Sequence, residues 1–304
     1  MSSFHPAKIK TPSASVRRAR PLLGTLVEIR AVADEAKAVR AVAAAFQAVA
    51  CVHRLMSAHE PTSDVGRLNR LAHAMPVRVD RHTWRVLDVA RRISGVSNGA
   101  FDVCVAPALV RWGYLPGWVG RPSNATDGWR AIELLPDSRV RFLERVAIDL
   151  GGIAKGFAVD LAAAALRAHG VARFTVNAGG DLRVGDTPEI VHVRDPARPT
   201  HLIPLAEVSG AAMATSGTYF AAREWNGTPV HPIVVPGSHA CASFRGSVSV
   251  LAPDCIVADA LTKVVAILGD ASRPALACFG AEACVIAQTG ELTRIGASPQ
   301  EAAA

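Results

Sequence analysis

The sequence predicts an α+β fold in which mixed strands and helices surround one core. Helical and strand-like periodicities follow each other along the 304 residues without a clean separation into two blocks. Half of the residues are hydrophobic and 19% are charged, which is typical of a folded chain rather than a disordered one. No internal repeat or low-complexity linker divides the sequence. We therefore expect a loose tail at residues 1–17 and a single domain over residues 18–304.

The N-terminal half is predicted to contain more helix than strand. Residues 24–33 alternate apolar and polar side chains, which indicates a strand, and residues 35–56 carry an apolar stripe at helical spacing. A short helix capped by Ser63 and a longer one over 83–97, ended by Asn98-Gly99, should follow. Residues 115–130, rich in glycine and proline, are expected to be irregular.

The C-terminal half is predicted to be rich in short strands. They are expected at 131–135, 139–142, 146–150, 173–177, 181–185, 190–194, 201–206, 211–215 and 247–252. Helices are expected over 155–169 and 257–268, the second opened at Asp259. The two glycines at 179 and 180 predict a tight turn between strands.

The stretch from Ile148 to Asp160 reads as an apolar strand, two glycines and an Ala-rich helix that starts near Lys155. Backbone N–H groups at such a helix start, together with a lysine, suit a phosphate or diphosphate. The spacing is not that of a P-loop. A plain strand-to-helix connection is the alternative interpretation.

Four aspartates and one histidine could have either a structural or a functional role. Asp102, Asp149 and Asp181 lie near glycine-rich turns. Asp259, at the start of an expected helix, could be a cap or a Mg²⁺ ligand. His231, in an apolar segment, could be a core residue or a base that faces a cleft.

Composition excludes some classes of partner. The net charge of +7 comes from scattered arginines with no aromatic-interleaved basic stripe, so we expect an anionic small ligand and no nucleic acid. The six cysteines show no metal-ligand spacing and lie among apolar neighbours, so they are expected to be buried, reduced thiols, which fits a cytoplasmic protein. No signal peptide, lipoprotein leader or run of about 18 apolar residues is recognised, so no membrane span is expected.

Taken in order, these motifs resemble the ApbE-type FAD:protein FMN transferases. The resemblance extends from Arg20 to Leu268. Its blocks are RPLLGT at 20–25, Met56-Ser57, Ser63-Asp64, Arg67-Leu68-Asn69, Ala100-Phe101-Asp102, Trp112-Gly113-Tyr114, residues 148–160, residues 177–181, Ala214-Thr215-Ser216-Gly217 and residues 258–261.

The resemblance implies a fold related to the T-fold, an FAD site and Mg²⁺ on the FAD diphosphate. It also implies transfer of FMN to a threonine of a partner flavoprotein, with release of AMP. The residues implied to contact FAD are Met56, Met75, Ala100, Phe101, Asp102, Asp149, Lys155 and Ile233. The carbonyl of Gly152 and the carboxylate of Asp259 are implied as metal ligands. An FAD diphosphatase that yields FMN and AMP, and an FAD-binding protein with reduced turnover, are the alternatives.

The chain departs from the family pattern at two places. Lys263 stands where the family usually has a threonine, four residues after Asp259. Lysine and aspartate then share one helix face. Lys263 either replaces part of the cation's role or weakens Mg²⁺ binding. The alternative is a solvated helix pair beside an intact metal site. After His231, the family aspartate is missing and Val235 is its nearest counterpart. His231, Asp259 and Lys263 are the predicted catalytic residues.

Overall fold

A large antiparallel sheet forms the centre of the molecule, which we describe from a computed structural model that covers residues 14–119, 128–219 and 221–296. Its eight strands lie in the order β1-β2-β6-β7-β10-β15-β16-β17. Their bounds are β1 Ala14–Leu22, β2 Thr25–Ala33, β6 Arg173–Ala178, β7 Asp181–Val184, β10 Ala212–Gly217, β15 Gly246–Ala252, β16 Glu282–Ala287 and β17 Leu292–Ile295.

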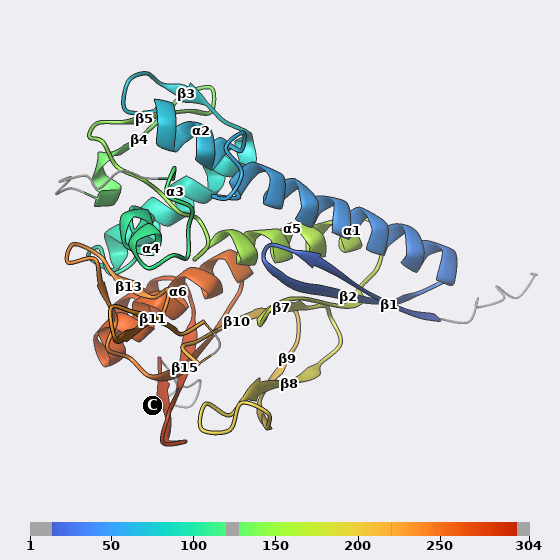
Figure 1. Cartoon of the computed structure of the whole chain (residues 1–304). Helices are drawn as coiled ribbons and strands as arrows, with labels where there is room; N and C mark the ends of the chain where they lie inside the picture. Colours follow the sequence, from blue (N-terminus) through green and yellow to red (C-terminus); the bar gives the residue numbers. More distant parts are fainter. Residues whose placement is uncertain (1–13, 120–127, 220, 297–304) are drawn as a thin grey trace, which may run out of the picture.

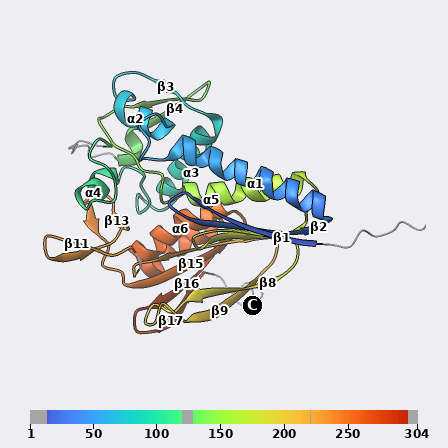
Figure 2. The same cartoon turned by 45° about the vertical axis from the view of Figure 1, so that its right-hand side comes forward.

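Three long helices cover one face of this sheet (Figure 1). They are α1 Glu35–Met56, α5 Ala154–Ala168 and α6 Cys255–Leu268. Their buried residues and the inward side chains of the strands, such as Ile29 and Val176, form the main core. On the opposite face, the hairpin of β8 Glu189–Arg194 and β9 Leu202–Val208 packs through Val191 and Val193 (Figure 2). The mixture of strands and helices confirms the predicted α+β class.

Shorter elements make up the rest of the described chain outside the large sheet, the β8–β9 hairpin and the three long helices. They are α2 Asp64–Leu71, β3 Val77–Arg78, α3 Arg81–Val96, α4 Ala106–Arg111, the 3₁₀ turn Gly128–Ala131, β4 Ile132–Leu135, β5 Arg139–Phe142, β11 Arg223–Trp225, β12 Thr228–Val230, β13 Val234–Val235, β14 Ala240–Cys241, the 3₁₀ turn Gly269–Ser272 and α7 Arg273–Cys278. Strands β3, β5 and β4 form a small sheet beside α2 and α3 (Figure 1).

The predicted strand at 146–150 is wrong. The segment is extended but pairs with no strand of the described chain. Its hydrogen bonds go elsewhere, because the side chain of Asn69 in α2 binds both the N–H of Ile148 at 2.8 Å and its C=O at 2.9 Å. The N–H of Asp149 donates to the carbonyl of Val103 at 2.8 Å. A side-chain amide and a loop thus satisfy the backbone that a neighbouring strand would otherwise pair.

Two predicted boundaries also need correction. Residues 14–17, assigned to the tail, belong to β1, which pairs along its whole length with β2 from Ala14↔Ala33 to Leu22↔Thr25. Residues 1–13 lie outside the described chain. Helix α6 begins at Cys255 rather than 257, so Asp259 lies inside the helix and does not open it.

The early start of α6 depends on Asp160 of α5. Its two carboxylate oxygens accept the N–H groups of Cys255 at 3.0 Å and Ile256 at 2.9 Å, and Arg183 donates to the same carboxylate at 2.6 Å. We expect Asp160→Asn to lower the free energy of unfolding by about 1–3 kcal/mol, since the amide accepts at only one atom and leaves one buried N–H unpaired. Urea unfolding measures the change.

Asp270→Asn is the matched control, because that carboxylate is mostly exposed and pairs only with Arg273 on the surface. Its expected effect is within about 0.5 kcal/mol. If the two variants unfold at the same urea concentration, the α5–α6 contact does not depend on Asp160.

Helix α1 bears on the membrane prediction. It is long and apolar enough, by length and composition alone, to span a membrane. Eight of its residues, including Phe46, Val49 and Val52, are buried in the core against α5 and the sheet. The expected absence of a membrane span stays a prediction.

Candidate functional site

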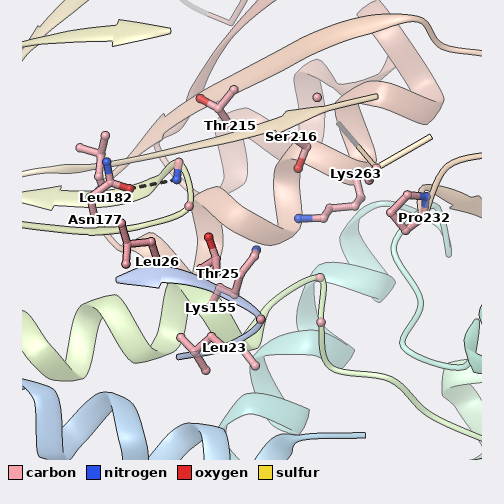
Figure 3. A pocket seen from close by; sticks show the side chains of 18 of the residues that line it. Leu23, Thr25, Leu26, Lys155, Asn177, Leu182, Thr215, Ser216, Pro232 and Lys263 are labelled. Carbon is pink, nitrogen blue, oxygen red and sulfur yellow. Dashed lines mark hydrogen bonds between the residues drawn. The ribbon is translucent and has the colours of Figure 1, made fainter. Parts of the chain in front are cut away.

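A cavity of about 1320 Å³ lies where the helical layer meets the turns of the large sheet. Five segments far apart in sequence contribute to its wall. They are the β1–β2 turn at residues 23–26, the end of α1 with Met56, the turn from Asp149 to Lys155, the β6–β7 turn at 179–180, and β10 with Thr215 and Ser216. Lys263 of α6 and Pro232 also line the cavity (Figure 3), as do Tyr114 and residues 192–194 of β8.

Backbone and side-chain hydrogen bonds fix the turn at the start of α5. Its N–H groups at Ile153 and Ala154 donate to the carbonyl of Leu150 at 3.0 and 2.8 Å. The carboxylate of Asp149 accepts the N–H of Gly151 at 3.0 Å. The N-cap residue Ile153 makes no side-chain hydrogen bond to α5, and the buried carboxylate of Asp259 accepts the N–H of Gly156 in the first turn at 3.1 Å.

Two lysines and two aspartates form a charged cluster at the base of the cavity. The Nζ atom of Lys155 lies 2.6 Å from Oδ2 of Asp181 and 3.4 Å from each carboxylate oxygen of Asp259. Lys263 donates to Oδ1 of Asp259, and its Nζ atom also lies 2.9 Å from the backbone oxygen of Asp259. Both ammonium groups reach toward the same part of the cavity, from α5 and α6 (Figure 3).

Local structure explains why these four side chains meet. Asp181 follows the two-glycine turn as the first residue of β7, which brings its carboxylate beside the first turn of α5. Asp259 is fully buried on α6, where Oδ2 accepts the N–H of Gly156 at 3.1 Å. Lys263 lies one helical turn later on the same face of α6.

The cluster separates the pKa values of its two carboxyl groups. Burial and the nearby charge of Asp259 raise the pKa of Asp181 to about 6. Burial also acts on Asp259, but the ammonium groups of Lys155 and Lys263 outweigh it and lower its pKa to about 2. Burial opposes the charge of Lys155, yet the two carboxylates raise its pKa above the ordinary value. Asp259 is therefore the more acidic carboxyl group of the pair.

Six of the residues predicted to contact FAD, to hold a metal or to act in catalysis lie on the wall of the cavity. Met56, Asp149, Gly152, Lys155, Ile233 and Lys263 line it. Asp259 lies directly beneath, in contact with both lysines.

Four of the predicted FAD contacts do not line this cavity: Met75, Ala100, Phe101 and Asp102. Met75 is exposed in the loop after α2. Phe101 is buried behind the glycine turn. The two carboxylate oxygens of Asp102 accept the N–H groups of Cys104 at 2.8 Å and Trp129 at 3.0 Å, and burial raises its pKa. Asp102 thus connects two loops next to the cavity.

His231 lies apart from the charged cluster. The two residues that follow it, Pro232 and Ile233, line the large cavity. The histidine itself is almost fully buried and lines a second cavity of about 180 Å³, with Nε2 3.0 Å from a guanidinium nitrogen of Arg245. Burial, with Arg245 as the second cause, lowers its pKa, so the imidazole is neutral at physiological pH.

The sequence did not assign a role to three polar residues in or next to the cavity wall, of which only Ser216 lines the cavity. Asp181 was recognised as an acid near a glycine turn but was given no role, although it is the closest partner of Lys155. Ser216 and Thr262 share a hydrogen bond of 2.7 Å between β10 and α6. The only signal for Asp181 was the two-glycine turn before it. Nothing in the spacing indicated the pairing of Ser216 with Thr262.

Comparison with known proteins decides the family. The sequence pattern described as the ApbE family matches residues 23–285. The chain belongs to the ApbE family. A Vibrio cholerae protein named FAD:protein FMN transferase is 28% identical over 244 residues, 74% of this chain and 72% of its own length. A protein of that name from Salmonella typhimurium is 25% identical over 317 residues, 95% of this chain and 89% of its length.

Solved structures agree with this assignment. The ApbE protein of Thermotoga maritima superposes with a TM-score of 0.81 at 26% identity, over 93% of this chain and 97% of its own. The flavin transferase ApbE of Vibrio cholerae has a TM-score of 0.78 over 96% of this chain and 99% of its own, and at 22% identity it supports the fold alone. Membership of the ApbE family makes this chain an enzyme of the transferase class.

Proposed function

We propose that this ApbE family member transfers the FMN half of FAD to a threonine hydroxyl of a partner flavoprotein and releases AMP. The observation that carries the proposal is the pair of ammonium groups, Lys155 and Lys263, on one wall of a large cavity beside the start of α5. Its volume of about 1320 Å³ exceeds the roughly 300–1,000 Å³ of ordinary small-molecule pockets, which leaves room for a dinucleotide.

The chemistry is one displacement at phosphorus. The threonine oxygen forms a bond to the phosphorus of the FMN half, and the bond from that phosphorus to the bridging oxygen breaks. AMP leaves with the bridging oxygen, and the hydroxyl proton passes to a base or to water. Negative charge grows on the AMP phosphate, so cations placed there in advance favour the step. The proposal assigns this role to Lys155 and Lys263, because both line the cavity.

The proposed FAD contacts are Met56, Asp149, Lys155 and Ile233, because they line the cavity. His231 as the base that accepts the threonine proton also remains a proposal. Its neutral imidazole suits a base, but its ring lines the second cavity beside Arg245.

Mg²⁺, expected from the sequence at Asp259 and Gly152, is left out of the proposed chemistry because the residues present do not fit a divalent cation. Oδ1 of Asp259 accepts from Lys263, and Oδ2 accepts from the N–H of Gly156. Among the described residues, no three His, Cys, Asp or Glu side chains are grouped so that they could hold a metal ion. A small hard cation that needs nearly ideal octahedral oxygen ligands finds ammonium groups instead.

The partner is proposed to be a cytoplasmic flavoprotein. All six cysteines are free thiols, which fits a reducing compartment. Only Cys104 and Cys255 are buried, so the expected burial of the other four is wrong.

Mass spectrometry with FAD and a purified acceptor domain of a bacterial electron-transfer flavoprotein tests the proposal. The expected result is an acceptor that gains one FMN phosphoester on a threonine, with AMP released in equal amount. Free FMN plus AMP, formed equally well without acceptor, would instead establish the alternative FAD diphosphatase. Intact bound FAD after prolonged incubation would establish the FAD-binding alternative.

A further inference from the structure

The side chain of Lys263 occupies the space between the two residues predicted to hold a metal. Its Nζ atom contacts both the carboxylate and the backbone oxygen of Asp259. Its Cε and Cδ atoms lie 3.4 and 3.9 Å from the position that a Cβ atom on Gly152 would take. These are ordinary van der Waals distances, so the lysine stem packs directly against Gly152 while its ammonium group contacts Asp259.

The oxygen atoms of Asp259 are already used. Oδ1 accepts from Lys263, Oδ2 accepts from Gly156, and Nζ of Lys155 is 3.4 Å from both. The backbone oxygen accepts from Lys263 and from the hydroxyl of Thr262 at 2.6 Å. A metal ion at Asp259 would have to displace a buried ammonium group and leave it next to a divalent charge, which is electrostatically costly.

Lys263 still has a donor for a ligand. An ammonium group carries three N–H donors, and the described contacts of Lys263 direct two of them to Asp259. The side chain lines the cavity and is 18% exposed, so its remaining donor is accessible from the cavity. Asp259 fixes the ammonium group in place, which is the arrangement that a preorganised phosphate site requires.

The geometry points to Lys263 as a built-in cation that takes the place of a divalent metal at the diphosphate, so that this chain binds FAD without Mg²⁺. The inference rests on the proposed function for the identity of the ligand. It goes further in assigning the charge neutralisation of the diphosphate to two lysines, Lys155 and Lys263, with Asp259 as the residue that positions them. Asp259 then acts through the lysines rather than as a metal ligand.

Calorimetric titration with FAD, in EDTA and in excess Mg²⁺, tests this inference. The wild-type dissociation constants in the two conditions should agree within about twofold, and Lys263→Met should weaken binding by about tenfold or more in EDTA. Lys263→Thr removes the ammonium group and supplies a hydroxyl oxygen, so FAD binding to this variant should become tighter on adding Mg²⁺. Lys37→Met, a lysine replacement in the first turn of α1, should bind like wild type. If Mg²⁺ tightens FAD binding to the wild type by about tenfold or more, the inference is overturned.

Mn²⁺ binding gives a second readout that needs neither FAD nor turnover. By electron paramagnetic resonance, wild type should leave added Mn²⁺ free, and Lys263→Thr should bind it; one bound Mn²⁺ per wild-type chain would overturn the inference. If FAD fails to bind in both calorimetric conditions, the proposed function fails and the Mn²⁺ result still decides between lysine and metal. If FAD binds equally well with and without Mg²⁺ but no FMN is transferred, the inference stands and only the transfer reaction is refuted.

Discussion

Lys155→Met is expected to weaken FAD binding by about 10- to 150-fold, the equivalent of one charge-assisted hydrogen bond of about 1.5–3 kcal/mol. Lys155 lies in the first turn of α5, lines the cavity and is shared by Asp181 and Asp259. Without its ammonium group, two buried carboxylates adjoin the phosphate site with only Lys263 to offset them. Repulsion then adds to the lost contact. Calorimetry with FAD measures the change.

The same substitution should lower the free energy of unfolding by about 3–5 kcal/mol, because it breaks a buried ion pair and leaves charge uncompensated. A double variant, Lys155→Met with Asp181→Asn, separates the two effects. Removing the partner carboxylate should restore much of the stability but not the affinity for FAD. Lys37→Met controls for the loss of a lysine elsewhere. Wild-type affinity in a folded Lys155→Met variant would remove the α5 turn from the ligand site.

Gly156→Ala should lower the free energy of unfolding by about 3 kcal/mol or more, at the upper end of overpacking effects. A Cβ atom at this position would lie 2.2 Å from the backbone oxygen of Cys255 and 2.9 Å from Cβ of Asp259. The overlap is with backbone, so no side-chain rotation relieves it. Helix α6 would have to move away from α5, and the contact of Asp259 with the N–H of Gly156 would be lost.

Gly95→Ala is the matched control for this experiment. Gly95 lies in the last turn of helix α3, and the nearest atom to its added methyl group would be a ring carbon of Trp129 at 3.9 Å. Alanine should therefore stabilise the protein by about 0.8–1 kcal/mol through helix propensity alone. In urea unfolding, Gly156→Ala should therefore lower the free energy of unfolding and Gly95→Ala should raise it. Stabilisation by both substitutions would mean that the α5–α6 contact is looser than the structure shows.

Local patterns in the sequence were enough to predict much of the fold. Helix α1 follows from its apolar stripe, and β6 and β7 follow from two apolar runs separated by glycines. The first residues of β1 were missed because exposed arginines dominate that strand, and its order comes from pairing with β2. The failures at 146–150 and at the start of α6 have a common cause. Asn69 and Asp160 satisfy backbone groups 79 and 95 residues away, and no local pattern records such contacts.

The candidate site was predictable where one segment supplies several groups. The glycine turn and Lys155 lie within five residues of each other, and the spacing of Asp259 and Lys263 is that of one helical turn. Joining these two pieces required the fold, since Lys155 contacts Asp259 from 104 residues away. The sequence left open whether Lys263 replaces a cation or weakens its binding. Its position against Gly152 and Asp259 favours replacement.

The order of strands in the large sheet has a consequence for how the protein is made. From β1 to β17, the strands lie across the sheet in the same order in which they occur along the chain. A ribosome therefore releases every strand next to an edge that already exists, and the sheet can grow in one direction during synthesis. The cavity wall does not close until α6 emerges with Asp259 and Lys263. Chains that end before α6 contain six of the eight strands but lack two of the four residues of the charged cluster.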